Sequence, residues 1–118
     1  MIYKKSKILF IGTVEFSYRA LSALIENKFD IVGVLTKGQS NFNSDYCDLT
    51  PLAKVNNIPI FYRTKDNEDE IISFINSKNP DIIYCFGWSH ILPKNILSIP
   101  KHGAVSYTHL RAHETLMN

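Results

Sequence analysis

The chain has 118 residues, of which 45% are hydrophobic, 12% aromatic and 20% charged, and its formal net charge is +2. This length and composition suit one domain with a single core, and they exclude a disordered charged tail, a collagen-like fibre and a disulfide-rich scaffold. The small net charge gives no sign of a basic surface that would bind nucleic acid. No apolar run approaches the ~20 residues of a membrane helix. We therefore expect a cytoplasmic protein that does not bind a membrane.

Short apolar runs alternate along the chain with stretches of helical periodicity. The apolar runs are nearly unbroken, which is typical of strands in a parallel sheet that has helices on both faces. Strands are predicted at residues 7–11, 31–35, 58–62 and 82–86, with a fifth that begins at 103. Helices are predicted at residues 15–27, 50–57, 67–78 and 93–97.

Polar residues mark the beginnings of these predicted helices. We expect Thr13 to cap the first helix, and Thr50 to cap the second, with Pro51 at its first helical position. Asn67 and Glu70 have the spacing of a capping box, which predicts the start of the third helix.

The alternation of strands and helices implies an α/β fold, a Rossmann-like, doubly wound parallel sheet with right-handed crossovers. We expect the strand order 3-2-1-4-5. Pro59 lacks an N–H group, so it belongs at the start of the third strand or on a sheet edge. Ligands of such sheets bind beyond the carboxyl ends of the strands, where the strand order reverses. The turns at Gly12 and Gly87 are therefore expected side by side at one crevice.

The turn after the first predicted strand carries one glycine, Gly12, followed by Thr13 and Val14. It lacks the Gly-x-Gly-x-x-Gly pattern that lets a backbone approach a pyrophosphate, which disfavours an ordinary dinucleotide site. Gly12 either permits a tight turn or lines a ligand. A response-regulator-like signalling domain needs a cluster of acids here, and Glu15 stands alone, so we rank that class low.

The turn after the fourth predicted strand contains the one tryptophan of the chain, Trp88, directly after Gly87. Backbone groups exposed at such a turn can hydrogen-bond a flat heterocycle, while Phe86 or Trp88 covers its face. The alternative is an ordinary strand-to-helix turn in which Trp88 fills a gap in the core.

Cysteine and histidine form no convincing metal-binding pattern. Cys47 and Cys85 are far apart in sequence, and Cys85 lies in an apolar run, as a small buried hydrophobe does. His109 and His113 have helical ligand spacing in a segment without a helical pattern. We predict no metal site and two ordinary thiols.

Three segments, in family order and spacing, resemble the N-terminal half of the catalytic domain of folate-dependent formyltransferases. They are KILFIGTVEFS at residues 7–17, NPDII at 79–83 and GWSHILP at 87–93, followed by Ile99-Pro100 and Gly103. The resemblance covers residues 7 to about 105. The family includes methionyl-tRNA formyltransferase and the nucleotide-sugar N-formyltransferases.

The resemblance implies transfer of a formyl group from 10-formyltetrahydrofolate to an amine. It implies that the folate pocket is lined by Phe86, Gly87, Trp88, Ser89 and His90, and that main-chain groups of this segment recognise the pterin. In the family, an Asn-x-His motif and a later Asp polarise the formyl group and move protons. These groups stabilise the developing oxyanion and remove the ammonium proton.

The sequence departs from the family at this motif. The Asn position falls on Ser106 and the His position on Thr108, so we assign no catalytic residue. The stretch from Val105 to Thr115 looks like translated sequencing-adaptor read-through. We expect a reading frame that is truncated or chimeric after about residue 105, with a formyltransferase segment at 1–105, a non-family tail at 106–118 and no activity of its own.

The polar loop at residues 37–48 is relevant to the identity of the molecule that accepts the formyl group. Methionyl-tRNA formyltransferases resemble one another in a basic, glycine-rich loop here, which suits a phosphate-rich partner. This loop has one Lys and two Asp, so we favour a nucleotide-linked amino sugar over tRNA as the acceptor. The alternative is that this is a variable surface loop that carries no information about the acceptor.

For the function of the whole chain, the second alternative is a non-catalytic module that binds a nucleotide or folate.

Overall fold

The structure, a computed structural model, describes residues 6–37, 47–64, 67–86, 96, 98–100 and 102–107, and for 105–107 it describes the backbone only. The strands are β1 (Lys7–Gly12), β2 (Asp30–Lys37), β3 (Ile60–Arg63), β4 (Ile82–Phe86) and β5 (Ala104–Tyr107). The helices are α1 (Glu15–Glu26), α2 (Thr50–Val55) and α3 (Glu68–Lys78). The helix predicted at 93–97 lies outside the described residues except for Ile96.

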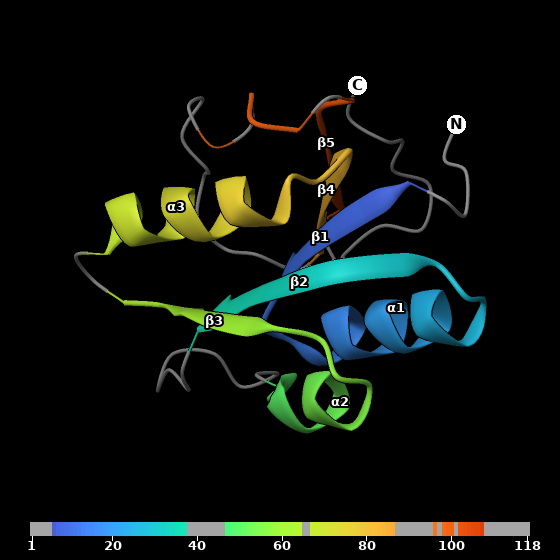
Figure 1. Ribbon diagram of the computed structural model, residues 1–118. Coiled ribbons are helices and arrows are strands. Elements are labelled where there is room, and N and C mark those ends of the chain that lie inside the picture. Colours follow the sequence, from blue (N-terminus) through green and yellow to red (C-terminus); the bar gives the residue numbers. More distant parts are fainter. Residues whose placement is uncertain are drawn as a thin grey trace.

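The strands form one parallel sheet in the order β3-β2-β1-β4-β5, which confirms the predicted topology (Figure 1). α1 and α2 cover one face of this sheet and α3 covers the other. The fold is therefore the Rossmann-like, doubly wound α/β arrangement that the alternating pattern predicts.

Side chains of alternate residues of β1 point into two separate hydrophobic cores, one on each face of the sheet. Ile8 and Phe10 pack with Leu21 of α1, whereas Leu9 and Ile11 pack with residues of α3. All four β1 side chains are fully buried. The unbroken apolar run of this strand is explained by this burial on both faces.

The start of α1 differs from the prediction, because Thr13 does not cap the helix. Val14 is the N-cap, and the Ser17 hydroxyl accepts hydrogen bonds from the N–H groups of Thr13 and Val14, each at 3.2 Å. Thr13 is fully buried, and its hydroxyl has no hydrogen-bond partner among the described residues. The N–H groups before the helix are thus bonded by Ser17, the third residue of the helix, as in one half of a capping box.

The start of α2 also differs from the prediction. The helix begins at Thr50 with Leu49 as its N-cap, and Asp48 Oδ1 accepts the N–H of Thr50 at 3.0 Å. The Thr50 hydroxyl bonds the Tyr62 hydroxyl instead of the helix backbone. Pro51 lies in the first turn as the second residue of the helix, one position later than expected.

Asn67 is the N-cap of α3, but its side chain makes no cap hydrogen bond, so the expected capping box is wrong. Its Oδ1 accepts the N–H of Thr64 at 2.9 Å, and its Nδ2 donates to the carbonyl oxygen of Tyr62 at 2.8 Å. The side chain therefore secures the end of the edge strand β3. The first turn of α3 contains Glu68, Asp69 and Glu70, where the helix dipole favours acids.

β3 begins at Ile60, two residues later than predicted. Pro59 precedes it and accepts the N–H of Val34 at 2.9 Å through its carbonyl oxygen. A proline at the start of an edge strand loses no ladder bond, which confirms the expected placement.

The expected non-family tail, residues 106–118, is described only to Tyr107, where β5 ends, and its nature stays a prediction. Within the described part of the chain, no helix has the length and apolar character needed to cross a membrane.

Candidate functional site: the edge between β1 and β4

The carboxyl ends of β1 and β4 lie side by side. Gly12, the last residue of β1, pairs in parallel register with Phe86, the last residue of β4. β1 and β4 are also the strands between which the order of the sheet reverses. Doubly wound sheets bind ligands where the strand order reverses, and this point lies at the position predicted from the sequence.

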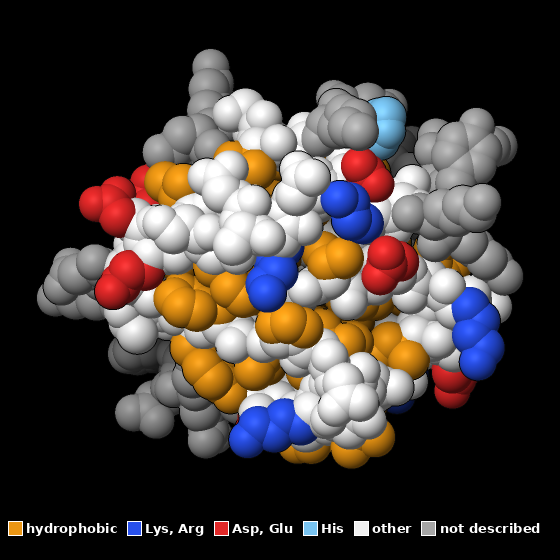
Figure 2. All heavy atoms as spheres, in the orientation of Figure 1, with side chains coloured by type: hydrophobic (Ala, Val, Ile, Leu, Met, Phe, Trp, Pro, Cys, Tyr) orange, Lys and Arg blue, Asp and Glu red, His pale blue; other side chains and the backbone are white. Residues whose placement is uncertain are grey.

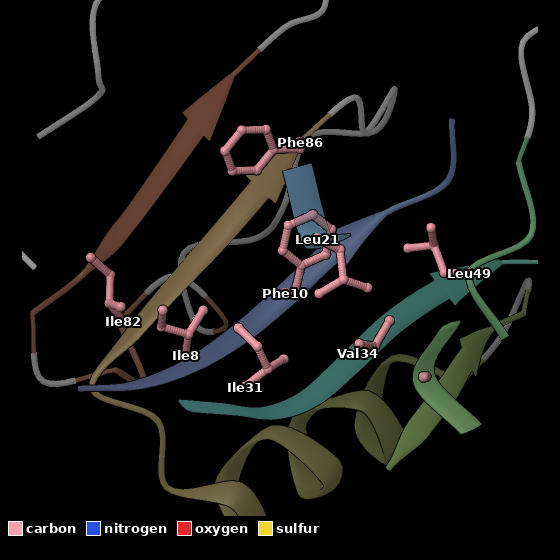
Figure 3. Close-up of a cluster of buried hydrophobic side chains, with 9 residues drawn as sticks. Ile8, Phe10, Leu21, Ile31, Val34, Leu49, Ile82 and Phe86 are labelled. Carbon is pink, nitrogen blue, oxygen red and sulfur yellow. The ribbon is translucent and has the colours of Figure 1, made fainter. Parts of the chain in front are cut away.

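The Phe86 ring lies in the core and not over an open crevice. It is 9% exposed and stacks on Phe10, with ring centroids 5.4 Å apart and planes 10° apart (Figure 3). Phe16 and Tyr84 contact it at centroid distances of 5.5 and 5.7 Å. These contacts make the Phe86 ring part of the core.

Gly87, Trp88, Ser89 and His90 lie outside the described residues. Their part in a folate pocket, and that of Phe86, stays a prediction. The described structure sets where this segment begins, at the buried end of β4 beside Gly12.

Ser17 connects the two strand ends and was given no role by the sequence reasoning. Its hydroxyl donates to the Phe86 carbonyl oxygen at 2.5 Å while it accepts the N–H groups of Thr13 and Val14. Ser17 is fully buried. We call this arrangement of Ser17, Thr13, Val14 and Phe86 the Ser17 clasp. The signal in the sequence was a small polar residue on the buried side of the first helical turn.

Gly12 makes the Ser17 clasp possible. A Cβ atom at residue 12 would overlap the Ser17 side chain and approach the Phe86 carbonyl oxygen to 2.8 Å. The glycine is needed for this close approach and not for a positive φ angle, because Gly12 lies within a regular strand.

The two ends of the polar loop 37–48 carry opposite charges. Lys37 pairs in register with Arg63, and burial together with the nearby Arg63 lowers the pKa of Lys37. At the other end, burial and the carboxylates of Glu15 and Asp48 raise the pKa of the Cys47 thiol. The raised pKa favours the protonated thiol over the thiolate. Residues 38–46 lie outside the described residues.

The described residues offer no candidate metal centre. On the face shown in Figure 2, hydrophobic side chains gather in the middle, and Lys and Arg side chains lie scattered around them. Cys85 is buried and both cysteines are free thiols, as predicted. The described residues include no group of three or more His, Cys, Asp or Glu side chains placed to hold a metal ion.

The sequence is similar to methionyl-tRNA formyltransferases, although no family model matches it. It is 36% identical over 105 residues to the enzyme of Clostridioides difficile, and 37% identical over 106 residues to that of Clostridium acetobutylicum. Each match covers 85% of this chain and 34% of the relative. The chain thus spans about a third of the length of the curated relatives that it matches.

Solved structures with the same fold include enzymes of formyl-group chemistry. Glycinamide ribonucleotide transformylase 1 from Geobacillus kaustophilus has a TM-score of 0.64 at 12% identity, with 86% of this chain and 57% of that chain covered. A formyltetrahydrofolate deformylase from Pseudomonas putida has a TM-score of 0.62 at 14% identity, with 90% and 39% covered. At these identities the likeness shows the fold alone.

Proposed function

Because this chain belongs to the formyltransferase family over the part that it spans, we propose that it supplies the folate-binding part of a formyl-transfer site. The formyl donor is 10-formyltetrahydrofolate. The donor binds at the edge between β1 and β4, where main-chain groups of the segment Phe86–His90 read the pterin. Ser106 and Thr108 occupy the positions of the family's catalytic Asn and His, so the proposal assigns donor binding, and not proton transfer, to this chain.

One observation carries the proposal: Gly12 and Phe86 meet at the point where the strand order reverses. A flat, polar heterocycle needs a crevice with a fixed backbone edge on one side. The buried Phe86 ring and the Ser17 clasp supply a rigid starting point for that edge.

For the acceptor we propose the amino group of methionyl-tRNA. The relatives carry the name methionyl-tRNA formyltransferase, which favours this acceptor over the nucleotide-linked amino sugar expected from the polar loop. Two cationic side chains, Lys37 and Arg63, lie side by side at one end of that loop and suit a phosphate-bearing partner.

The donor site is tested by titrating 5-formyltetrahydrofolate, a stable reduced folate, into the purified chain. We expect saturable binding by calorimetry and a matching change in Trp88 emission, because Trp88 is the one tryptophan and lies in the proposed segment. The control ligand is p-aminobenzoyl-glutamate, which lacks the pterin and should not bind. A folded chain that shows no saturable response at millimolar reduced folate would contradict the proposal.

A further inference from the structure

Two cationic side chains lie on neighbouring strands at the carboxyl ends of β2 and β3. Lys37 is the last residue of β2, Arg63 is the last residue of β3, and the two residues pair in register (Figure 1). Side chains two residues apart on a strand share a face. Lys37 and Arg63 therefore lie on the same face as Leu35 and Phe61, which pack in the core beneath α3, and both cationic residues are partly buried.

This arrangement carries an electrostatic cost. Like charges directly opposite each other on neighbouring strands destabilise a sheet. Partial burial and the charge of Arg63 both lower the pKa of Lys37, because they disfavour its protonated form. Within the described part of the chain Arg63 forms no ion pair, although three exposed acids, Glu68, Asp69 and Glu70, begin the next helix. An anion bound by both cations would offset this cost.

The pair lies at the same edge of the sheet as the proposed donor site. The strands are parallel, so their carboxyl ends meet at one edge. Along that edge the order is β3, β2, β1 and β4, and neighbouring strands of a sheet are about 5 Å apart. The pair of cations is therefore about 10 Å from the point where β1 and β4 meet.

An acceptor that carries a phosphate group suits this separation. In methionyl-tRNA, the aminoacyl ester and the terminal ribose separate the reactive amine from the nearest phosphate. In a nucleotide-linked amino sugar, the sugar ring separates them. The phosphate of either molecule can lie at the ends of β2 and β3 while the amine approaches the donor at the ends of β1 and β4.

We propose that Lys37 and Arg63 together bind a phosphate group of the formyl acceptor. The guanidinium of Arg63 donates two parallel hydrogen bonds to phosphate oxygens, and the ammonium of Lys37 adds a second positive charge. This inference rests on the proposed function for the identity of the bound molecule as a formyl acceptor. The binding of phosphate by the pair does not depend on folate.

The test uses the full 118-residue chain and two phosphate probes, inorganic pyrophosphate and tRNA without its amino acid. Arg63→Gln and Lys37→Gln each remove one charge of the pair, and Arg63→Lys keeps the charge but loses the paired donors. Lys54→Gln is the matched control, because it removes one charge from an exposed position on α2. Calorimetric titration at low ionic strength measures each affinity, and urea denaturation confirms that every variant is folded.

We expect the parent chain to bind at least one of the probes saturably. Arg63→Gln and Lys37→Gln should each weaken that binding by about tenfold, and Arg63→Lys should weaken it less. Lys54→Gln should keep the parent affinity. A loss confined to pyrophosphate supports the site and identifies a small phosphate-bearing acceptor, whereas a loss confined to tRNA supports it and identifies the RNA backbone.

The phosphate site and the donor site fail in different experiments. A folded parent chain that binds neither probe would overturn the phosphate site, as would parent-like affinity in Arg63→Gln or Lys37→Gln, or an equal loss in Lys54→Gln. None of these titrations contains folate. Absence of 5-formyltetrahydrofolate binding overturns the proposed donor site and leaves the phosphate titrations to be judged on their own.

Discussion

At the scale of single residues, the Ser17 clasp explains two features of the segment KILFIGTVEFS. Gly12 has no side chain because Ser17 and the Phe86 carbonyl occupy the space that a Cβ would need. Ser17 is a serine because three buried backbone groups need one hydroxyl. Each requirement combines contacts within this segment with one contact to the Phe86 carbonyl of β4, which is far away in sequence.

We predict that Gly12→Ala destabilises the fold by about 1–3 kcal/mol, because the new methyl group meets backbone and a buried side chain that cannot move freely. The matched control is Gly33→Ala, whose Cβ would have as its three nearest neighbours side-chain atoms of Leu9, Phe74 and Lys78, at 3.1–3.4 Å. Urea denaturation followed by circular dichroism measures both. A Gly12→Ala midpoint at or above that of Gly33→Ala would show that the space is not limiting.

At the scale of elements, the edge strand β3 is secured by the helix that follows it. Asn67 bonds the backbone of Tyr62 and Thr64, so one carbonyl at this exposed edge is satisfied within the chain. Unpaired backbone groups on an edge strand invite pairing with other chains, and an internal partner limits this.

We predict that Asn67→Ala lowers the free energy of unfolding by about 1–3 kcal/mol, since it leaves two backbone groups without their partner. Asn56→Ala is the control, because the Asn56 amide donates one exposed hydrogen bond to the Leu52 carbonyl oxygen and its loss should cost little. Chemical denaturation of the two variants side by side measures the difference. Equal midpoints would mean that Asn67 does not secure the edge.

At the scale of the whole molecule, the chain is one sheet with its proposed donor site at the reversal between β1 and β4. The relatives that it matches are about three times longer. The proposed function therefore concerns one edge of one sheet, within a chain that spans about a third of these relatives.

A chimaera tests the acceptor. Residues 7–105 replace the matching third of the Clostridioides difficile relative, and folding is checked by circular dichroism. We expect the chimaera to formylate methionyl-tRNA and not a nucleotide-linked amino sugar, with the unmodified relative as the control. Transfer to the amino sugar alone would reverse the acceptor assignment. A folded chimaera that is inactive on both acceptors would contradict the donor role.

The spacing of hydrophobic residues and the positions of turn residues were sufficient to predict the architecture. The apolar runs placed the strands to within one or two residues for β1, β2 and β4, and the strand order followed from general rules for α/β sheets. Helix starts were predicted less well, because Thr13, Thr50 and Asn67 have several possible backbone partners, and only the packed fold selects among them.

The sequence by itself determined the fold class, the order of the strands and the point at which that order reverses, because those depend on local hydrophobic pattern and on chain connectivity. Only the tertiary structure decided that the Phe86 ring belongs to the core and that Ser17 joins two strand ends. The physical reason is distance along the chain: a hydrogen bond across 69 residues leaves no periodic trace in either segment.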